Sequence, residues 1–167
     1  GVKVVRQRYP AAGRPNARVE LLVTEIAGIA PARKLDAAAA GDGYLARVDW
    51  FPDGKQVAVQ RHSRDQKTLE LLAVDVQSGA ARTLLVERSD TWVPLHEELA
   101  FLKRRPAFLW ASDRSGFRHL ELRDLNGRLI RPITAGEWMV VADGRERAVK
   151  WIDEERELVY FVANRDT

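Results

Sequence analysis

Residues 49–59 read DWFPDGKQVAV, which is an aromatic strand end, a tight polar turn and a second apolar strand. The Pro-Asp-Gly triplet at the centre is typical of a β-hairpin turn, because proline presets one backbone angle and glycine accepts a positive one. The same order recurs in residues 100–110, AFLKRRPAFLW, and in residues 150–161, KWIDEERELVYF. The second residue of each copy is aromatic, and these residues, Trp50, Phe101 and Trp151, are 51 and 50 residues apart. This period indicates an array of similar β-units.

A second pattern, a strand followed by a turn that holds glycine, recurs out of phase with the first at residues 20–28, 70–79 and 120–127. Its spacing is again close to 50 residues. An acidic residue precedes each turn, at Glu25, Asp75 and Asp124. We expect these carboxylates to accept hydrogen bonds from the backbone N–H groups of the turns.

Together the two patterns predict an all-β chain, a partial β-propeller built from four-stranded antiparallel blades of about 50 residues. One blade is expected from strands at residues 44–50, 56–62, 67–75 and 81–87, and the next from strands at 97–103, 107–112, 117–124 and 128–134. Shorter outer pieces are expected at Val19–Ile26, Arg33–Leu35, Val149–Ile152 and Glu157–Ala163. A β-sandwich, whose hairpins can imitate a weak repeat, is the alternative.

The predicted organisation is a single partial propeller domain over residues 1–167, with a half blade at 1–43, blades at 44–90 and 91–136, and a half blade at 137–167. The Ala-rich stretch 36–40 is too short to form a stable helix by itself, so we expect a loop there.

Composition excludes several classes of function. The chain has 46% hydrophobic and 31% charged residues, which is typical of a globular domain, and no apolar run approaches the length of a membrane-spanning helix. There are no cysteines, and the three histidines (His62, His96 and His119) are far apart, so we expect neither thiol chemistry nor a metal site. The net charge of +3 comes from bases interleaved with acids, which argues against a nucleic-acid surface. No cofactor motif is present.

Catalytic motifs are absent from the sequence as well. There is no Gly-x-Ser-x-Gly elbow, and the neighbours His62 and Ser63 should point to opposite faces of a strand. The acidic pair Glu154–Glu155 lies in a predicted turn, and Glu97–Glu98 lies at the start of a predicted strand; we expect both pairs to be ordinary solvated surface. The sequence therefore offers no catalytic residue.

The most distinctive segment runs from Phe108 to Leu120 and reads FLWASDRSGFRHL. An apolar strand enters a polar turn, and an aromatic–basic pair, Phe117 and Arg118, follows Gly116. One interpretation is a plain hairpin in which Phe117 packs and Arg118 pairs with an acid. The other is a loop that presents both side chains to a ligand, because arginine binds carbonyl or carboxylate oxygens as a fork and phenylalanine covers an apolar group.

Several segments resemble the N-terminal propeller domain of the dipeptidyl peptidase IV family. They are residues 91–96 (TWVPLH), 108–114 (FLWASDR) and 116–120 (GFRHL), with further agreement at 9–16 (YPAAGRPN), 134–138 (TAGEW) and 159–163 (VYFVA). The resemblance covers almost the whole chain.

The resemblance implies a parent protein that is a serine-type dipeptidyl peptidase, which releases Xaa-Pro dipeptides from peptide N-termini. In that family an eight-bladed propeller caps a C-terminal α/β-hydrolase domain. By resemblance Phe117 and Arg118 match substrate-binding positions, so this chain would be a non-catalytic segment that shapes and gates the peptide-binding site. A periplasmic or secreted location is implied in the same way. The family's glutamate pair for the substrate amine is expected before residue 1, and its role is not transferred to Glu97–Glu98.

Two alternatives remain open at this stage. The chain could be a stand-alone propeller scaffold that binds other proteins, without a hydrolase partner. It could also form a strand-swapped homodimer, because a closed ring removes exposed strand edges. The outer strands around Val19–Ile26 of one copy would then complete the inner strands around Val149–Ala163 of another.

Overall fold

The computed structural model describes residues 13, 18–37, 43–95, 97–142 and 147–164, and their regular structure is entirely β-strand. The motif at residues 9–16 lies outside the described residues except for Gly13, as do His96 and most of the Ala-rich stretch; its first residues, Asp36 and Ala37, form a turn. No helix of the described part is long and apolar enough to cross a membrane.

Two four-stranded antiparallel sheets form the centre of the structure. The first blade contains β3 (Tyr44–Trp50), β4 (Gln56–His62), β5 (Thr68–Asp75) and β6 (Ala81–Arg88), in that order. The second blade contains β7 (Ala100–Phe101), β8 (Ala107–Ser112), β9 (His119–Asp124) and β10 (Leu129–Pro132), again in chain order. This simple meander confirms the predicted four-stranded units.

Smaller sheets flank the two blades. The leading pair is formed by β1 (Leu21–Val23) and β2 (Arg33–Leu35), and the trailing pair by β12 (Val149–Asp153) and β13 (Leu158–Phe161). A short strand, β11 (Met139–Val140), pairs with β14 (Ala163–Asn164). Both β11 and β12 are therefore antiparallel to strands within residues 158–164.

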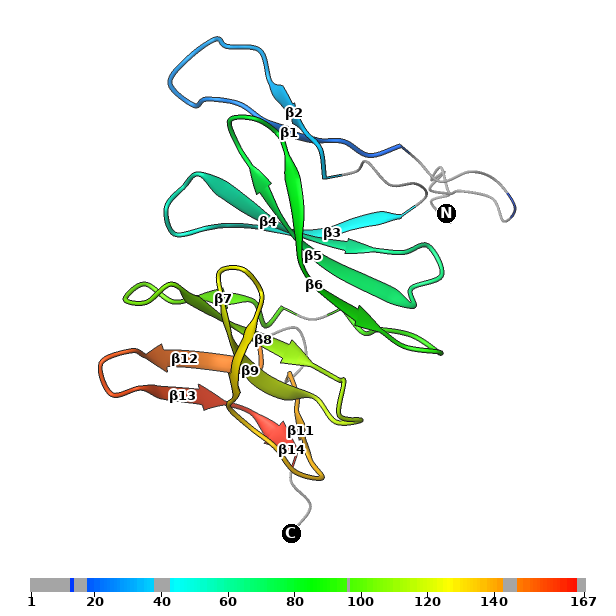
Figure 1. Cartoon of the computed structure of the whole chain (residues 1–167), viewed down its shortest axis with the longest axis vertical. Helices are drawn as coiled ribbons and strands as arrows, with labels where there is room; N and C mark the ends of the chain where they lie inside the picture. Colours follow the sequence, from blue (N-terminus) through cyan, green and yellow to red (C-terminus); the bar gives the residue numbers. More distant parts are fainter. Residues whose placement is uncertain (1–12, 14–17, 38–42, 96, 143–146, 165–167) are drawn as a thin grey trace, which may run out of the picture.

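The sheets stack face to face in a row, from the leading pair through both blades to the trailing pair (Figure 1). Leu21, Val23 and Leu35 pack on one face of the first blade. The opposite face meets the second blade around the fully buried Phe108 and Trp110, and the far face of the second blade receives Ile152 and Val159. Every blade thus buries both faces, as the apolar runs in β4, β5 and β8 require.

Several predicted strand limits are too wide. The strand expected at 97–103 is only Ala100–Phe101, the one expected at 117–124 begins at His119, and the one expected at 128–134 is Leu129–Pro132. In the leading pair, Val19–Ile26 shortens to Leu21–Val23. Among the excluded residues, Glu98 contacts the neighbouring sheet and Arg118 lies in a turn. The predicted division of the chain into blades and half blades at residues 43, 90 and 136 stays a prediction.

The third copy of the aromatic repeat is displaced by one residue. Trp50 pairs with Val57, and Phe101 pairs with Phe108; in both cases the partner is seven residues along the chain. The side chains of Trp50 and Phe101 each face the preceding sheet. In the trailing pair it is Ile152 that pairs seven residues on, with Val159, and faces the second blade. Trp151 pairs with Tyr160 and points away from the second blade. A shift of one residue reverses the face of a strand, so matching Trp151 with Trp50 was wrong.

The expectation that Glu97–Glu98 is solvated surface is wrong for Glu98. This side chain is only 4% exposed, and its two carboxylate oxygens accept the backbone N–H groups of Ala148 (2.6 Å) and Val149 (3.0 Å) at the start of β12. Glu97 is half-exposed and pairs with Arg47 of β3, with Nε 2.6 Å from Oε1. Adjacent glutamates thus connect the second blade to the sheets on either side of it.

Glu154 is partly exposed, as expected, but it also contacts the neighbouring sheet. Its oxygens accept the backbone N–H groups of Lys103 (2.7 Å) and Arg104 (2.8 Å), which form the β7–β8 turn of the neighbouring blade. Its turn neighbour Glu155 is exposed, as expected, and pairs with Arg104. One carboxylate of each acidic pair therefore fixes the spacing between two sheets.

Acidic residues also close the turns, as predicted at two of three positions. Asp75 Oδ1 accepts N–H bonds from Gln77 (3.1 Å) and Ser78 (2.7 Å), and Asp124 Oδ1 accepts them from Asn126 and Arg128 (2.9 Å each). The loop after Glu25 is held instead by the hydroxyl of Thr24, which donates to the carbonyl of Ala30 (3.2 Å).

Gly127 brings the β9–β10 turn against the first blade. Its φ is +85°, and a Cβ added there would lie 2.1 Å from the carbonyl oxygen of Leu84 in β6. Only glycine accepts both this backbone angle and this approach.

Glu98→Ala should lower the free energy of unfolding by about 2–3 kcal/mol, because it leaves two buried N–H groups without acceptors. The neighbouring variant Glu97→Ala removes a half-exposed ion pair and should cost less than about 1 kcal/mol. Urea unfolding of both variants measures the difference. Equal costs would contradict the assigned role of Glu98.

Asp75→Ala should destabilise the fold at neutral pH and have little effect in acid. Hydrogen bonds from Ser78, first from its N–H and then from its hydroxyl, hold the pKa of the Asp75 carboxyl below its usual value of 3.8. A lowered pKa in the folded state contributes stability above the unfolded value, and this contribution is lost as pH falls through the folded value. Unfolding curves at pH 7 and pH 3 should show the gap between wild type and variant closing; an unchanged gap would exclude the carboxylate as its source.

Candidate functional site

The ends of the strands form two different faces. On the turn face, tight turns such as 51–55, 102–106 and 154–157 follow one another from sheet to sheet. On the connection face lie the hairpin 113–118 and the two segments that link consecutive sheets, 89–99 and 133–138. Hydrogen bonds join neighbours within this face, such as Val93 N–H to the carbonyl of Gln66 (2.9 Å). The longer irregular segments of the connection face make it the candidate functional surface.

The β8–β9 hairpin holds both predicted site residues on the connection face. Arg118 donates from Nε (3.3 Å) and Nη2 (3.0 Å) to Oδ2 of Asp113 at the other end of the same hairpin. Phe117 is half-buried, and the Ser115 hydroxyl donates to its carbonyl (3.0 Å). The loop presents neither side chain fully to solvent. The hairpin interpretation thus holds for Arg118, and Phe117 is a wall of a recess.

That recess, of about 480 Å³, is bounded by Phe117 and Arg114 on one side and by residues 134–137 on the other. Arg114 is half-exposed, and its Nη2 lies 3.2 Å from Oε1 of Glu87. Glu87 is buried and also accepts the indole N–H of Trp110 (3.1 Å). A buried carboxylate therefore fixes one end of the Arg114 guanidinium, while the rest of the group borders the recess and a smaller one of about 170 Å³ next to Trp92.

His119 fixes the opposite wall of the recess. Its Nε2 lies 2.9 Å from the carbonyl oxygen of Gly136, so this nitrogen carries the proton and donates. Its Nδ1 lies 3.1 Å from the hydroxyl of Thr134, which donates to it and in turn accepts the N–H of Leu120 (2.9 Å). Trp138 stands edge-on to the imidazole at 5.1 Å and stacks with Phe161 at 6.0 Å. The histidine is thereby fully engaged in holding residues 134–138.

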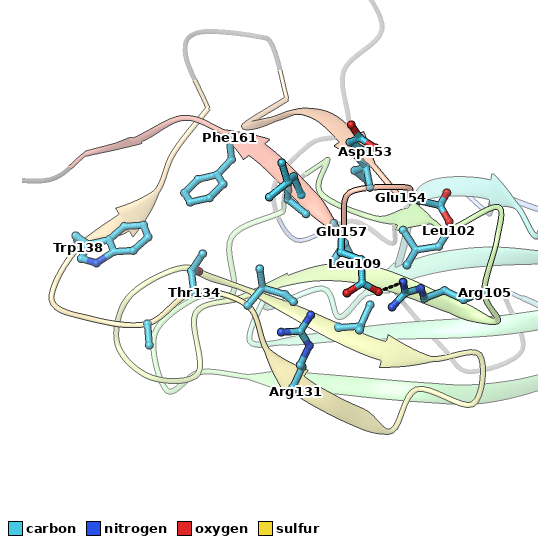
Figure 2. A pocket seen from close by; sticks show the side chains of 16 residues that line it. Leu102, Arg105, Leu109, Arg131, Thr134, Trp138, Asp153, Glu154, Glu157 and Phe161 are labelled. Carbon is cyan, nitrogen blue, oxygen red and sulfur yellow. Dashed lines mark hydrogen bonds and ion pairs between the residues drawn. The ribbon is translucent and has the colours of Figure 1, made fainter.

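A second hollow, of about 460 Å³, lies between the second blade and the trailing pair (Figure 2). Its floor is apolar, with Leu109 and Leu122 from the blade and Val159 from the trailing pair. Arg105, which pairs with Glu157, and Arg131 border it. This groove is a sheet face that further strands can cover and lies apart from the hairpin residues.

The remaining predictions about chemistry concern His62 and metal ligands. The hydroxyl of Ser63 donates to Asp65 (2.6 Å) and accepts the N–H of Thr68 (3.0 Å), so it is not paired with His62. Within residues 18–37, 43–95, 97–142 and 147–164, no group of three or more His, Asp or Glu side chains is arranged to hold a metal ion.

The comparisons with known proteins agree with this architecture. The family model described as the dipeptidyl peptidase IV N-terminal region matches residues 1–167. The chain belongs to this family. It is 30% identical over 166 residues to a probable dipeptidyl peptidase 4 of Neosartorya fischeri, and 26% identical over 219 residues to dipeptidyl peptidase 8 of Mus musculus. These alignments cover 95% and 96% of this chain but only 21% and 24% of the relatives.

The fold is similar to that of solved members of the family. Porphyromonas gingivalis dipeptidyl peptidase 4 superposes with a TM-score of 0.77 over 93% of this chain and 21% of that one, at 24% identity. The chain thus spans about a fifth of the length of the dipeptidyl peptidases it matches. Its partial propeller corresponds to one stretch of a larger N-terminal region.

Sequence reasoning missed Glu87, Arg114 and His119 as parts of the site. Arg114 and His119 both lie in the distinctive segment 108–120, but the residues that position them come from other parts of the chain. Glu87 is the penultimate residue of β6 in the first blade, 27 residues before Arg114, and no local pattern marks it.

Arg118→Ala should lower the free energy of unfolding by about 1 kcal/mol, because it leaves Asp113 without its partner in a half-buried hairpin. The matched control is Arg156→Ala on the turn face, an exposed arginine that pairs with Asp153 and should change stability by less than about 0.5 kcal/mol. Thermal unfolding compares the two. If both variants melted like the wild type, the Arg118–Asp113 pair would not stabilise the fold, and Arg118 would be available to bind a ligand.

Proposed function

We propose that this chain is a non-catalytic part of the propeller of a dipeptidyl-peptidase-IV-like serine exopeptidase, where it shapes and gates the entrance to the peptide-binding site. The proposal is carried by one combination of observations. The family model matches the full length of the chain, and the Phe117–Arg118 hairpin lies on the irregular connection face. The relatives are much longer chains, which supports a C-terminal α/β-hydrolase domain in the parent as the partner of this face.

The chemistry of the hairpin suits a peptide with an apolar penultimate residue such as proline. Phe117 offers an aromatic wall to an apolar ring, and half-exposed Arg114 offers N–H donors to peptide carbonyl oxygens at the mouth of the recess. Arg118, held by Asp113, keeps the hairpin in one conformation. In this role the residues bind and orient the substrate, and the bond-breaking groups come from the rest of the parent.

No residue of this chain supplies the nucleophile. The sequence lacks a Gly-x-Ser-x-Gly elbow, and Ser63 is engaged with Asp65. The periplasmic or secreted location implied by the family stays part of the proposal. A stand-alone scaffold is the competing function, and it predicts that Phe117 has no effect on peptide hydrolysis.

The test is hydrolysis of a Gly-Pro anilide by the full-length parent carrying Phe117→Ala. Loss of an apolar wall at the substrate should lower kcat/KM about tenfold, corresponding to about 1.4 kcal/mol of binding in the transition state, with most of the change in KM. The isolated 167-residue chain should release no chromophore.

The control is Lys55→Ala, an exposed residue of the turn face, which should leave kcat/KM unchanged. Equal rates for both variants and the wild type would contradict a role of the hairpin at the substrate. Turnover by the isolated chain would contradict its assignment as non-catalytic.

A further inference from the structure

Two recesses lie next to the β8–β9 hairpin on the connection face. The larger one, of about 480 Å³, lies between the hairpin and residues 134–137. The smaller one, of about 170 Å³, lies between the hairpin and the segment that follows β6, with Trp92 and Pro94 in its wall. Arg114 borders both recesses, so the two hollows are neighbours. One ligand that crosses this arginine can therefore occupy both of them.

The wall of the smaller recess at Trp92 is held by the backbone on either side of it. The hydroxyl oxygen of Ser89 accepts the N–H groups of Thr91 and Trp92, both at 3.2 Å. Val93 is buried in the core between the two blades and donates its N–H to the carbonyl of Gln66 (2.9 Å). Trp92 itself stays 58% exposed. The segment thus presents a large aromatic surface on a fixed backbone.

The hairpin between the recesses offers a donor and an acceptor on adjacent residues. Nη2 of Arg114 is directed at Glu87, and within the described residues the other N–H groups of this guanidinium are available. Both N–H groups that Arg118 directs at Asp113 go to Oδ2, so in the same part of the chain Oδ1 is available as an acceptor. The Arg114 and Asp113 side chains are 53% and 29% exposed. This pair complements a peptide backbone, which carries both C=O acceptors and N–H donors.

We propose that the two recesses bind a peptide substrate in an extended conformation across the hairpin, so that the parent recognises the peptide beyond the dipeptide it releases. This rests on the proposed function, in which Phe117 covers the penultimate residue of the substrate. Alternate side chains of an extended peptide lie on the same side. Because only one residue precedes the penultimate one, the next side chain on that side belongs to the fourth peptide residue, and the one after it to the sixth. The smaller recess, beside Trp92, suits a small apolar side chain such as that of valine.

The test is the release of Gly-Pro by the full-length parent from octapeptides that start with Gly-Pro and continue with glycine, except for one valine at position 4, 5, 6 or 7. Valine at position 4 or 6 should raise kcat/KM about tenfold over the all-glycine peptide, because its side chain enters the smaller recess. Valine at position 5 or 7 should have little effect, because its side chain points to the opposite side.

Three variants assign this gain to the recess. Trp92→Ala should abolish it, whereas Trp92→Phe, which keeps an aromatic wall, should retain most of it. Lys55→Ala, the exposed control on the turn face, should keep the gain in full. Because Trp92 is largely exposed, circular dichroism and the melting temperature should show that both of its variants fold like the wild type.

Equal gains at odd and even positions, or no gain at any position, would overturn the proposal. A gain that survives Trp92→Ala would place the valine elsewhere and overturn it as well. If Trp92→Ala slowed the hydrolysis of Gly-Pro anilide as much as that of the valine peptide, Trp92 would contact the rest of the parent instead of the extended substrate. Failure of the proposed function is distinguishable, because it shows as an unchanged Gly-Pro anilide rate in Phe117→Ala.

Discussion

The structure depends on one constraint: each sheet is apolar on both faces and therefore has to be covered on both. In β8 every residue is buried, and in β4 and β5 buried residues point alternately to the leading pair and to the second blade. Such sheets are stable only in a stack. The stack in turn decides where strands may end, which loops meet and where apolar surface is left open.

Polar contacts then set the geometry of the stack. Glu98 and Glu154 each receive two backbone N–H groups from a neighbouring sheet, and in both cases the partners are about 50 residues away, one period of the repeat. A carboxylate that accepts two N–H groups fixes position and direction more strictly than apolar packing does. The charged pair of Arg47 and Glu97 continues this arrangement between β3 of the first blade and the segment that leads into β7 of the second.

The candidate site follows from the same stacking. Because Glu87 lies near the end of the last strand of the first blade, it can reach Trp110 and Arg114 of the second blade and hold the arginine at the recess. His119 holds the opposite wall through Thr134 and Gly136. The recess is thus rigid on two sides before any ligand arrives. Rigid walls support the proposed role of this segment in orienting a peptide substrate.

The sequence alone determined the all-β class, the 50-residue unit, its order of strands and the family, because turn residues and alternating apolar runs are local signals. It also located the Asp75 and Asp124 turn caps, whose partners lie within four residues. It could not show that Glu98 is buried, that Arg118 is held by Asp113 or that Glu87 supports Arg114. It also misplaced Trp151 on the trailing pair. Only the tertiary structure decided these points, because the burial and partner of a charged side chain depend on which sheet stands opposite it, and a shift of one residue reverses the face on which a side chain lies.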